Sequence, residues 1–258
     1  MRPGRSGSGA GGYFNSPPPR VLAHRGLALE APENTLLAFA KAIAAGVTHI
    51  ETDVHESADG VAIVSHDDTL TRVAGRNVSV NQLTVAELGR VDLGSGQNFP
   101  TLAEALDAFP DARFNIDVKS AGAVQPTIDA IAATGAVNRV LITSFNSVRR
   151  KETAKGLPGV ATSASFSEML QLTAAIRLGL RRRARRLLAD FDAVQLPERW
   201  KGVPVVTPPL LQLVEEVGVE AHVWTVNDPA DMLRLWNLGV DGIVTDRADL
   251  ALEILRAR

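Results

Sequence analysis

Ionisable side chains lie at or near the ends of several short apolar segments of this chain. We interpret these segments as parallel strands. His24 and Arg25 close the first such segment, and the second contains Glu51 and Asp53. Because side chains alternate along a strand, Glu51 and Asp53 project from the same face. Carboxylates this close repel each other unless a cation lies between them, and oxygen ligands favour Mg²⁺, Ca²⁺ or Mn²⁺ over zinc. The pattern predicts a hard divalent metal ion at this point.

Another carboxylate lies on a later strand. Asp117 and Lys119 share one face of the apolar segment that contains them. We expect Asp117 to complete the metal site and Lys119 to add positive charge to a phosphate pocket. A simple ion pair between Asp117 and Lys119 is the alternative interpretation.

Two histidines are candidates for proton transfer. His24 can exchange a proton near neutral pH, and the neighbouring Arg25 can donate two hydrogen bonds to phosphoryl oxygens. His66 follows a predicted hairpin over Gly60–Ser65, where it would lie across the metal from His24. We therefore predict one histidine as general base and the other as general acid.

The remaining candidates are weaker. Trp224 either belongs to the core or stacks on a glycerol or alkyl face near the barrel mouth. His55 points the same way as Asp53 but lies past the end of its strand, whereas His49 and His222 are interpreted as structural.

The elements that must position these residues follow a regular alternation. From Arg20 onward, short β-branched segments alternate with longer segments of helical period, which is typical of repeated strand–helix units. The predicted strands are Val21–His24, His49–Val54, Phe114–Val118, Val140–Thr143, Val160–Thr162, Ala193–Gln195, Ala221–Thr225 and Gly242–Val244. The predicted helices are Thr35–Ala45, Leu102–Phe109, Ala123–Thr134, Val148–Lys155, Phe166–Leu188, Pro208–Val217, Ala230–Leu238 and Leu250–Arg256. Eight such units predict an α/β fold, a closed (β/α)8 TIM barrel, with the active face at the C-terminal ends of the strands.

Two segments depart from this rhythm. A polar stretch over about residues 67–100 predicts a small insertion after the second strand, of a size that often forms a lid or a substrate wall. Residues 1–19 are rich in Gly, Pro and Ser and are predicted to be a disordered tail, leaving 20–258 as one barrel domain.

Composition excludes several classes of function. The chain of 258 residues has no cysteine, so disulfides, thiolate metal sites and a cysteine nucleophile are excluded. Its 27 basic and 29 acidic residues leave no excess of positive charge to bind a nucleic-acid backbone, and its single tyrosine offers little surface for stacking on bases. We find no secretory or transmembrane segment and expect a cytoplasmic protein. The basic run Arg177–Arg186 is interpreted as a solvated helix face, with an anionic membrane or partner patch as the alternative.

Several motifs, in order, resemble the glycerophosphodiester phosphodiesterase family from about Val21 to the C-terminus. These motifs are His24–Gly26, Pro32–Thr35, Glu51–Val54, Asp59–Gly60, Val64–Asp67, Asp117–Lys119, Val223–Asn227 and Gly242–Asp246. The resemblance is specific because the motifs agree in both order and spacing.

The resemblance implies a role for each candidate. Glu51, Asp53 and Asp117 would bind one divalent metal, Mg²⁺ or Ca²⁺ or else Mn²⁺. By the same resemblance His24 and His66 would be the acid and base, and Arg25 and Lys119 the phosphate contacts. The family usually has Glu at the position of Asp117, which is shorter by one methylene. A water molecule in the gap or a changed metal preference would accommodate this difference.

The implied activity is hydrolysis of a small glycerophosphodiester to glycerol 3-phosphate and an alcohol. The nucleophile is left open between water and the substrate's own hydroxyl. Two alternatives are a phospholipase D-like enzyme acting on lysophospholipids, which needs an apolar channel, and a non-catalytic barrel that serves as a binding module. Another phosphodiester is a further possibility, and the oligomeric state is left open.

Overall fold

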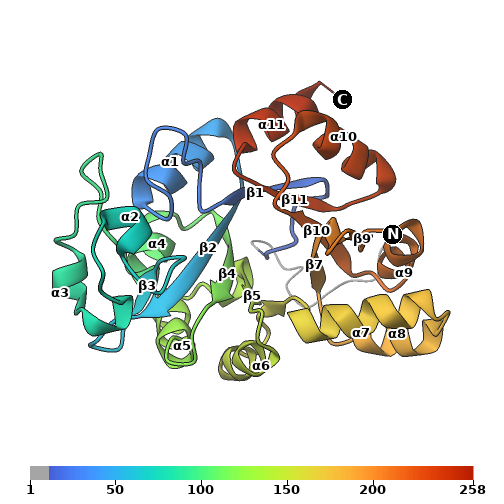
Figure 1. The fold of residues 1–258 in the computed structure, drawn as a ribbon, viewed down its shortest axis with the longest axis horizontal. Coiled ribbons are helices and arrows are strands. Elements are labelled where there is room, and N and C mark those ends of the chain that lie inside the picture. The colour runs from blue at the N-terminus through green and yellow to red at the C-terminus, as the bar shows by residue number, and fades with distance from the viewer. Residues whose placement is uncertain (1–11, 258) are drawn as a thin grey trace.

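The computed structural model describes residues 12–257, and its centre is a nearly closed barrel of eight parallel strands with helices around it (Figure 1). The barrel strands are β1 (Arg20–His24), β2 (His49–Glu56), β4 (Arg113–Val118), β5 (Val140–Thr143), β6 (Ala161–Thr162), β7 (Ala193–Pro197), β10 (Glu220–Trp224) and β11 (Gly242–Thr245). Their order is β6-β5-β4-β2-β1-β11-β10-β7, and a parallel bridge between Ser163 and Ala193 joins the two end strands. The predicted (β/α)8 TIM barrel is confirmed.

Helices follow the strands and cover the outside of the barrel. They are α1 (Leu36–Ala45), α4 (Leu102–Ala108), α5 (Val124–Ala133), α6 (Ser147–Gly156), α7 (Phe166–Arg177), α8 (Arg181–Leu188), α9 (Pro208–Glu216), α10 (Pro229–Leu238) and α11 (Ala248–Arg256).

The prediction of one helix over Phe166–Leu188 is wrong, because the chain turns between α7 and α8. Gly179, with φ of 67°, adopts the left-handed conformation that this turn requires.

The insertion after β2 forms a small lobe beside the barrel. It begins with β3 (Ala62–Val64), which pairs antiparallel with the end of β2, and continues through α2 (Thr71–Ala74), the 3₁₀ turn η1 (Val80–Gln82) and α3 (Val85–Leu88). A second 3₁₀ turn, η2 (Val137–Arg139), precedes β5, and a short hairpin of β8 (Arg199–Trp200) and β9 (Val203–Pro204) follows β7. The lobe has its own apolar cluster, made of Ile63, Leu70, Val80, Leu88, Val91 and Phe99. The cluster packs the lobe internally, and the pairing of β3 with β2 joins it to the strand that carries the carboxylate pair.

The predicted disordered tail covers residues 1–19, of which 1–11 lie outside the described residues. Residues 12–19 differ from that prediction, because Tyr13 is completely buried against the barrel. Its backbone oxygen accepts a hydrogen bond from His49 Nε2, and its ring packs edge-on against the His49 ring. This part of the segment therefore packs against the barrel, and a composition rich in Gly and Pro did not reveal it.

None of the helices within residues 12–257 has the length and apolar character needed to cross a bilayer.

The buried His49 predicts how stability depends on pH. Burial lowers the pKa of His49 from 6.5 to about 3, so the folded protein keeps this ring neutral while the unfolded chain protonates it. This contribution to the free energy of unfolding is complete above pH 6.5 and declines as the pH falls toward 3. We expect it to lose about 2 kcal/mol between about pH 7.5 and about pH 5.

Urea unfolding of the wild type and His49→Gln across this range would measure the contribution. Glutamine can still donate to the Tyr13 oxygen but does not titrate, so its acid slope should be shallower than that of the wild type. Equal slopes in the two proteins would contradict the assignment. Glu220, another buried group with a shifted pKa, titrates from 4.5 downward and so contributes little above pH 5.

Candidate active site

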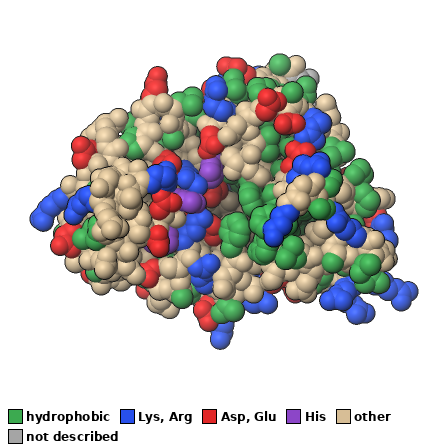
Figure 2. Space-filling view, viewed as in Figure 1, with side chains coloured by type: hydrophobic (Ala, Val, Ile, Leu, Met, Phe, Trp, Pro, Cys, Tyr) green, Lys and Arg blue, Asp and Glu red, His purple; other side chains and the backbone are tan. Residues whose placement is uncertain are grey.

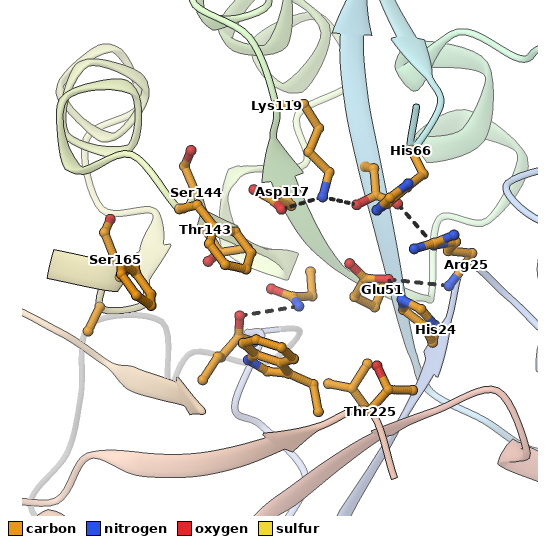
Figure 3. Close-up of a pocket in the computed structure, with 18 of the residues that line it drawn as sticks. His24, Arg25, Glu51, His66, Asp117, Lys119, Thr143, Ser144, Ser165 and Thr225 are labelled. Carbon is orange, nitrogen blue, oxygen red and sulfur yellow. Dashed lines mark hydrogen bonds and ion pairs between the residues drawn. The ribbon is translucent and has the colours of Figure 1, made fainter. Parts of the chain in front are cut away.

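One pocket opens at the C-terminal ends of the barrel strands, and all eight candidate residues line it (Figure 3). The candidates are His24, Arg25, Glu51, Asp53, His66, Asp117, Lys119 and Trp224. Strand register accounts for their proximity, since His24 pairs with Glu51 between β1 and β2, and Asp53 pairs with Asp117 between β2 and β4. Side chains at paired positions of neighbouring parallel strands face the same side of the sheet.

A tight turn at the end of β1 aims Arg25 into the pocket. Arg25 and Gly26 both adopt left-handed conformations, with φ of 57° and 85°. A Cβ atom on Gly26 would lie 2.7 Å from the backbone carbonyl carbon of Ala38, so only glycine fits the turn. Arg25 Nη1 lies 2.9 Å from Glu33 Oε1, and Nε lies 3.5 Å from Asp53 Oδ2 without forming a hydrogen bond. This N–H group is therefore available to a phosphoryl oxygen.

His24 is held by a carboxylate that the sequence analysis did not include among the site residues. Its Nδ1 donates a 2.6 Å hydrogen bond to Asp246 Oδ1, while Nε2 lies 3.9 Å from Glu51 Oε2. Asn227 fixes Asp246 in turn through a 2.7 Å hydrogen bond. Burial lowers the pKa of His24, but the Asp246 hydrogen bond and the Glu51 charge outweigh it and raise that pKa above its ordinary value. His24 can therefore hold a proton near neutral pH.

Glu51 and Asp53 are both buried, yet their surroundings differ. Burial, followed by the charge of Asp53, raises the pKa of Glu51 to about 8. Burial also acts to raise the pKa of Asp53, but Lys119 and Arg25 outweigh it and lower that pKa. Asp53 is further held by Asn34 Nδ2, which donates to its Oδ2 at 3.1 Å. Within this pair, Glu51 is the carboxylate whose charge is less fully compensated.

Lys119 lies between two carboxylates in this structure. Its Nζ is 2.7 Å from Asp53 Oδ1 and 2.7 Å from Asp117 Oδ2, so the ion pair with Asp117, which was the alternative interpretation, is present and Asp53 shares it (Figure 3). Burial lowers the pKa of Lys119, but these two carboxylates outweigh it and raise the pKa. Burial raises the pKa of Asp117, whose second oxygen, Oδ1, is buried and has no hydrogen-bond partner among the described residues.

The three carboxylates have the oxygen donors that a hard cation prefers. Glu51, Asp53 and Asp117 present only oxygen atoms to the pocket, and the unpartnered Asp117 Oδ1 and the raised pKa of Glu51 both mark a lack of positive charge. In the part of the chain that the structure describes, however, no three His, Cys, Asp or Glu side chains are grouped closely enough to enclose an ion. The Lys119 ammonium lies between two of the three carboxylates, so a metal ion and Lys119 would compete for them.

His66 reaches the pocket from the insertion. Its Nδ1 forms a 2.7 Å hydrogen bond with Asp67 Oδ1, and Arg72 Nε donates to the other Asp67 oxygen at 2.6 Å. Arg72 also donates to Glu33, the carboxylate that pairs with Arg25. The insertion therefore helps to position one histidine and one phosphate-contact candidate through the same arginine.

The other three histidines lie outside this pocket. His55 forms a 3.2 Å hydrogen bond with the backbone oxygen of His66, and so supports the segment that carries His66. His49 begins β2, at the opposite end of the barrel, and His222 is buried in the middle of β10, where its Nε2 lies 3.1 Å from Glu220 Oε2. Their interpretation as structural residues agrees with these positions.

The hydrogen bond between His24 and Asp246 leads to a testable expectation. Because Asp246 raises the pKa of His24, the Asp246→Asn variant should lower that pKa and reduce kcat at least about tenfold through loss of the ring's orientation. Titration of His24 by NMR alongside a pH profile of kcat would measure both effects, and Asp246→Glu should partly restore them. An unchanged His24 pKa together with an unchanged kcat would contradict the assignment.

Comparison with known proteins adds independent findings. Residues 24–250 match the model of the glycerophosphoryl diester phosphodiesterase family. The chain is 43% identical over 240 residues to "Probable glycerophosphodiester phosphodiesterase 2" of Mycobacterium tuberculosis, covering 92% of this chain and 91% of that protein. It is 30% identical over 250 residues to a glycerophosphodiester phosphodiesterase of Caldanaerobacter subterraneus, covering 92% and 97%. Among solved structures, an Oleispira antarctica phosphodiesterase in complex with the product sn-glycerol 3-phosphate has a TM-score of 0.75 and 26% identity, covering 93% and 97%.

Proposed function

Because this chain belongs to the glycerophosphoryl diester phosphodiesterase family, and is therefore a phosphoric diester hydrolase, we propose that it hydrolyses small glycerophosphodiesters to glycerol 3-phosphate and an alcohol. The observation that carries the proposal is the meeting of two histidines, three carboxylates and two cations in one pocket. This set can bind a phosphodiester and move protons on both sides of it.

The two cations supply the contacts for the phosphate. Arg25 has a buried Nε–H without a hydrogen-bond partner, and Lys119 brings an ammonium group to the same pocket. Bound oxygens of a phosphodiester would receive hydrogen bonds from both, and charge-assisted bonds of this kind are among the strong ones in proteins. Arg25 and Lys119 thus orient the phosphorus for attack.

The two histidines are suited to proton transfer on either side of the phosphate. Figure 3 shows His24 and His66 on either side of Arg25. One histidine accepts the proton of the nucleophile, which is water or the substrate's own glycerol hydroxyl, and the other donates a proton to the departing alcohol. Asp246 and Asp67 hold the two rings in place through their Nδ1 atoms.

A divalent cation, Mg²⁺, Ca²⁺ or Mn²⁺, would be held by Glu51, Asp53 and Asp117. When bound, it would neutralise negative charge that gathers on the phosphoryl oxygens. Glu51 would then be ionised at neutral pH, and Asp117 Oδ1 would gain the partner that it lacks. Lys119 would give up part of its contact with Asp53 and Asp117 and turn toward the phosphate.

Product analysis with glycerophosphocholine tests the proposed reaction. We expect the purified protein, supplied with Mg²⁺, Ca²⁺ or Mn²⁺, to release glycerol 3-phosphate and choline in equal amounts. Release of glycerol and phosphocholine would mean that the other ester bond is cleaved. An absence of both product pairs would overturn the proposed substrate class.

A further inference from the structure

We propose that Arg149 binds an acidic group on the alcohol that leaves the phosphate, so that the protein accepts glycerophosphodiesters whose alcohol carries a carboxylate. Glycerophosphoserine is a substrate of this chemical class. The inference rests on the proposed function, because the alcohol is part of the substrate of that same site. Arg149 would hold the alcohol without taking part in the bond changes, and the products would be glycerol 3-phosphate and serine.

A second cavity adjoins the catalytic pocket, and we call it the side cavity. It has a volume of about 650 Å³ and is lined by the end of β2 and the insertion on one side and by Lys119, Ser120 and Arg149 on the other. His66 and Lys119 line both the side cavity and the catalytic pocket. An alcohol attached to a phosphate at Lys119 can therefore extend past His66 into the side cavity.

The polarity of the two cavities favours this direction for the alcohol. Three aromatic rings, Phe145, Phe166 and Trp224, line the catalytic pocket but not the side cavity, and they suit the carbon skeleton of the glycerol. Every residue that lines the side cavity is polar or ionisable. Figure 2 shows charged and histidine side chains gathered beside hydrophobic ones in the middle of this face. The polar side cavity is therefore left to a charged alcohol.

Arg149 brings a half-buried cation to the side cavity. Its Nε is buried without a hydrogen-bond partner, and within residues 12–257 its guanidinium forms no ion pair. Lys119, by contrast, is already held by Asp53 and Asp117. Arg149 lies in the first turn of α6, where a helix favours acidic side chains, so the stability of the helix does not account for an arginine here. An anionic ligand would supply the acceptor that this guanidinium lacks.

The carboxylates around the side cavity leave room for an anion at Arg149. Glu56 accepts a hydrogen bond from Ser120, and Asp67 is bonded to His66 and Arg72. The third carboxylate, Asp68, is exposed, so water and salt screen its charge.

A carboxylate held at Arg149 would lie close to the reacting phosphate. Burial raises the pKa of Asp117, and the charge of Arg149 is one of those that act against this rise, which places the guanidinium near the catalytic carboxylates. An arginine can donate two parallel hydrogen bonds to a carboxylate, and charge-assisted bonds of this kind are strong. Arg149 is thus suited to select the alcohol part of the substrate.

Two substrates that differ only by a carboxylate test the inference. Release of glycerol 3-phosphate would be measured from glycerophosphoserine and from glycerophosphoethanolamine, each with the divalent cation that best supports turnover. We expect Arg149→Gln to lower the ratio of the first kcat/KM to the second by about tenfold, the lower end of the effect of a hydrogen bond to a charged group. Arg149→Lys should restore part of the ratio, because lysine keeps the charge but not the two parallel donors.

Lys151→Gln is the matched control, because it removes one positive charge from the same helix outside the side cavity. The Lys151 side chain is 65% exposed, with its Nζ 3.5 Å from Glu168 Oε1, and this variant should keep the wild-type ratio. Turnover of glycerophosphoethanolamine shows that each variant is folded. An unchanged ratio in Arg149→Gln, with or without an equal loss on both substrates, would overturn this inference and leave the proposed function standing. Failure of the wild type to hydrolyse either substrate would overturn both.

Discussion

His24→Ala should lower kcat for glycerophosphocholine by about 10²–10⁴-fold, the range that general acid–base groups contribute. The reason lies in the geometry of the ring, whose Nδ1 is held by Asp246 while Nε2 lies 3.9 Å from Glu51 Oε2 in the pocket. Alanine removes the proton carrier and leaves the neighbouring carboxylates in place. Steady-state kinetics at saturating substrate would measure the loss, and His66→Ala should show a loss of similar size.

A histidine outside the pocket provides the control for this experiment. His49→Gln changes a buried ring at the opposite end of the barrel, so its kcat near pH 7.5 should match that of the wild type. Circular dichroism of all three variants would show whether the fold is kept. If folded His24→Ala retained kcat within about threefold of the wild type, well short of the expected range, His24 would not transfer a proton in the rate-limiting step.

Asp53→Asn should have an effect of comparable size for a different reason. The Asp53 carboxylate accepts hydrogen bonds from Lys119 and Asn34 and is a proposed metal ligand. An amide carries no charge, so the variant should bind a divalent cation more weakly and lower kcat by about 10²–10⁴-fold, since metal ions supply several kcal/mol of transition-state stabilisation. Calorimetric titration with Mn²⁺ gives a readout that does not depend on activity.

Asp68→Asn is the matched control, because Asp68 is an acidic residue of the insertion that lies outside the catalytic pocket. It should bind Mn²⁺ as the wild type does. Undiminished Mn²⁺ binding by Asp53→Asn would remove Asp53 from the proposed metal site. The structure would then assign this carboxylate to holding Lys119 alone.

Two rules, the alternation of side chains along a strand and the common direction of parallel barrel strands, account for the part of the site that could be predicted from the sequence. Glu51 and Asp53 could be assigned to one face because strand geometry fixes the direction of every second side chain. Asp117 could be added because its segment has the same pattern, and parallel strands of a barrel end on one side. These rules depend only on local sequence and element type, and they explain why Glu51, Asp53 and Asp117 meet in one pocket.

Contacts between distant side chains could not be predicted in this way. Asp246 belongs to the motif Gly242–Asp246, but its hydrogen bond to His24 depends on the adjacency of β11 and β1 and on the rotamers of both residues. The position of Lys119 between Asp53 and Asp117 is also a matter of side-chain packing. Tyr13 is buried because of the shape of the barrel surface that it packs against. The Gly- and Pro-rich sequence around Tyr13 carries no information about that surface.

The proposed metal dependence is tested most directly by removing and restoring the metal. Choline release from glycerophosphocholine would be measured after treatment with EDTA and dialysis, and again after Mg²⁺, Ca²⁺ or Mn²⁺ is added back. We predict that turnover is lost on chelation and restored by at least one of these ions. Full turnover in the chelated, metal-free protein would contradict the account, and would mean that Lys119 and Arg25 supply the positive charge by themselves.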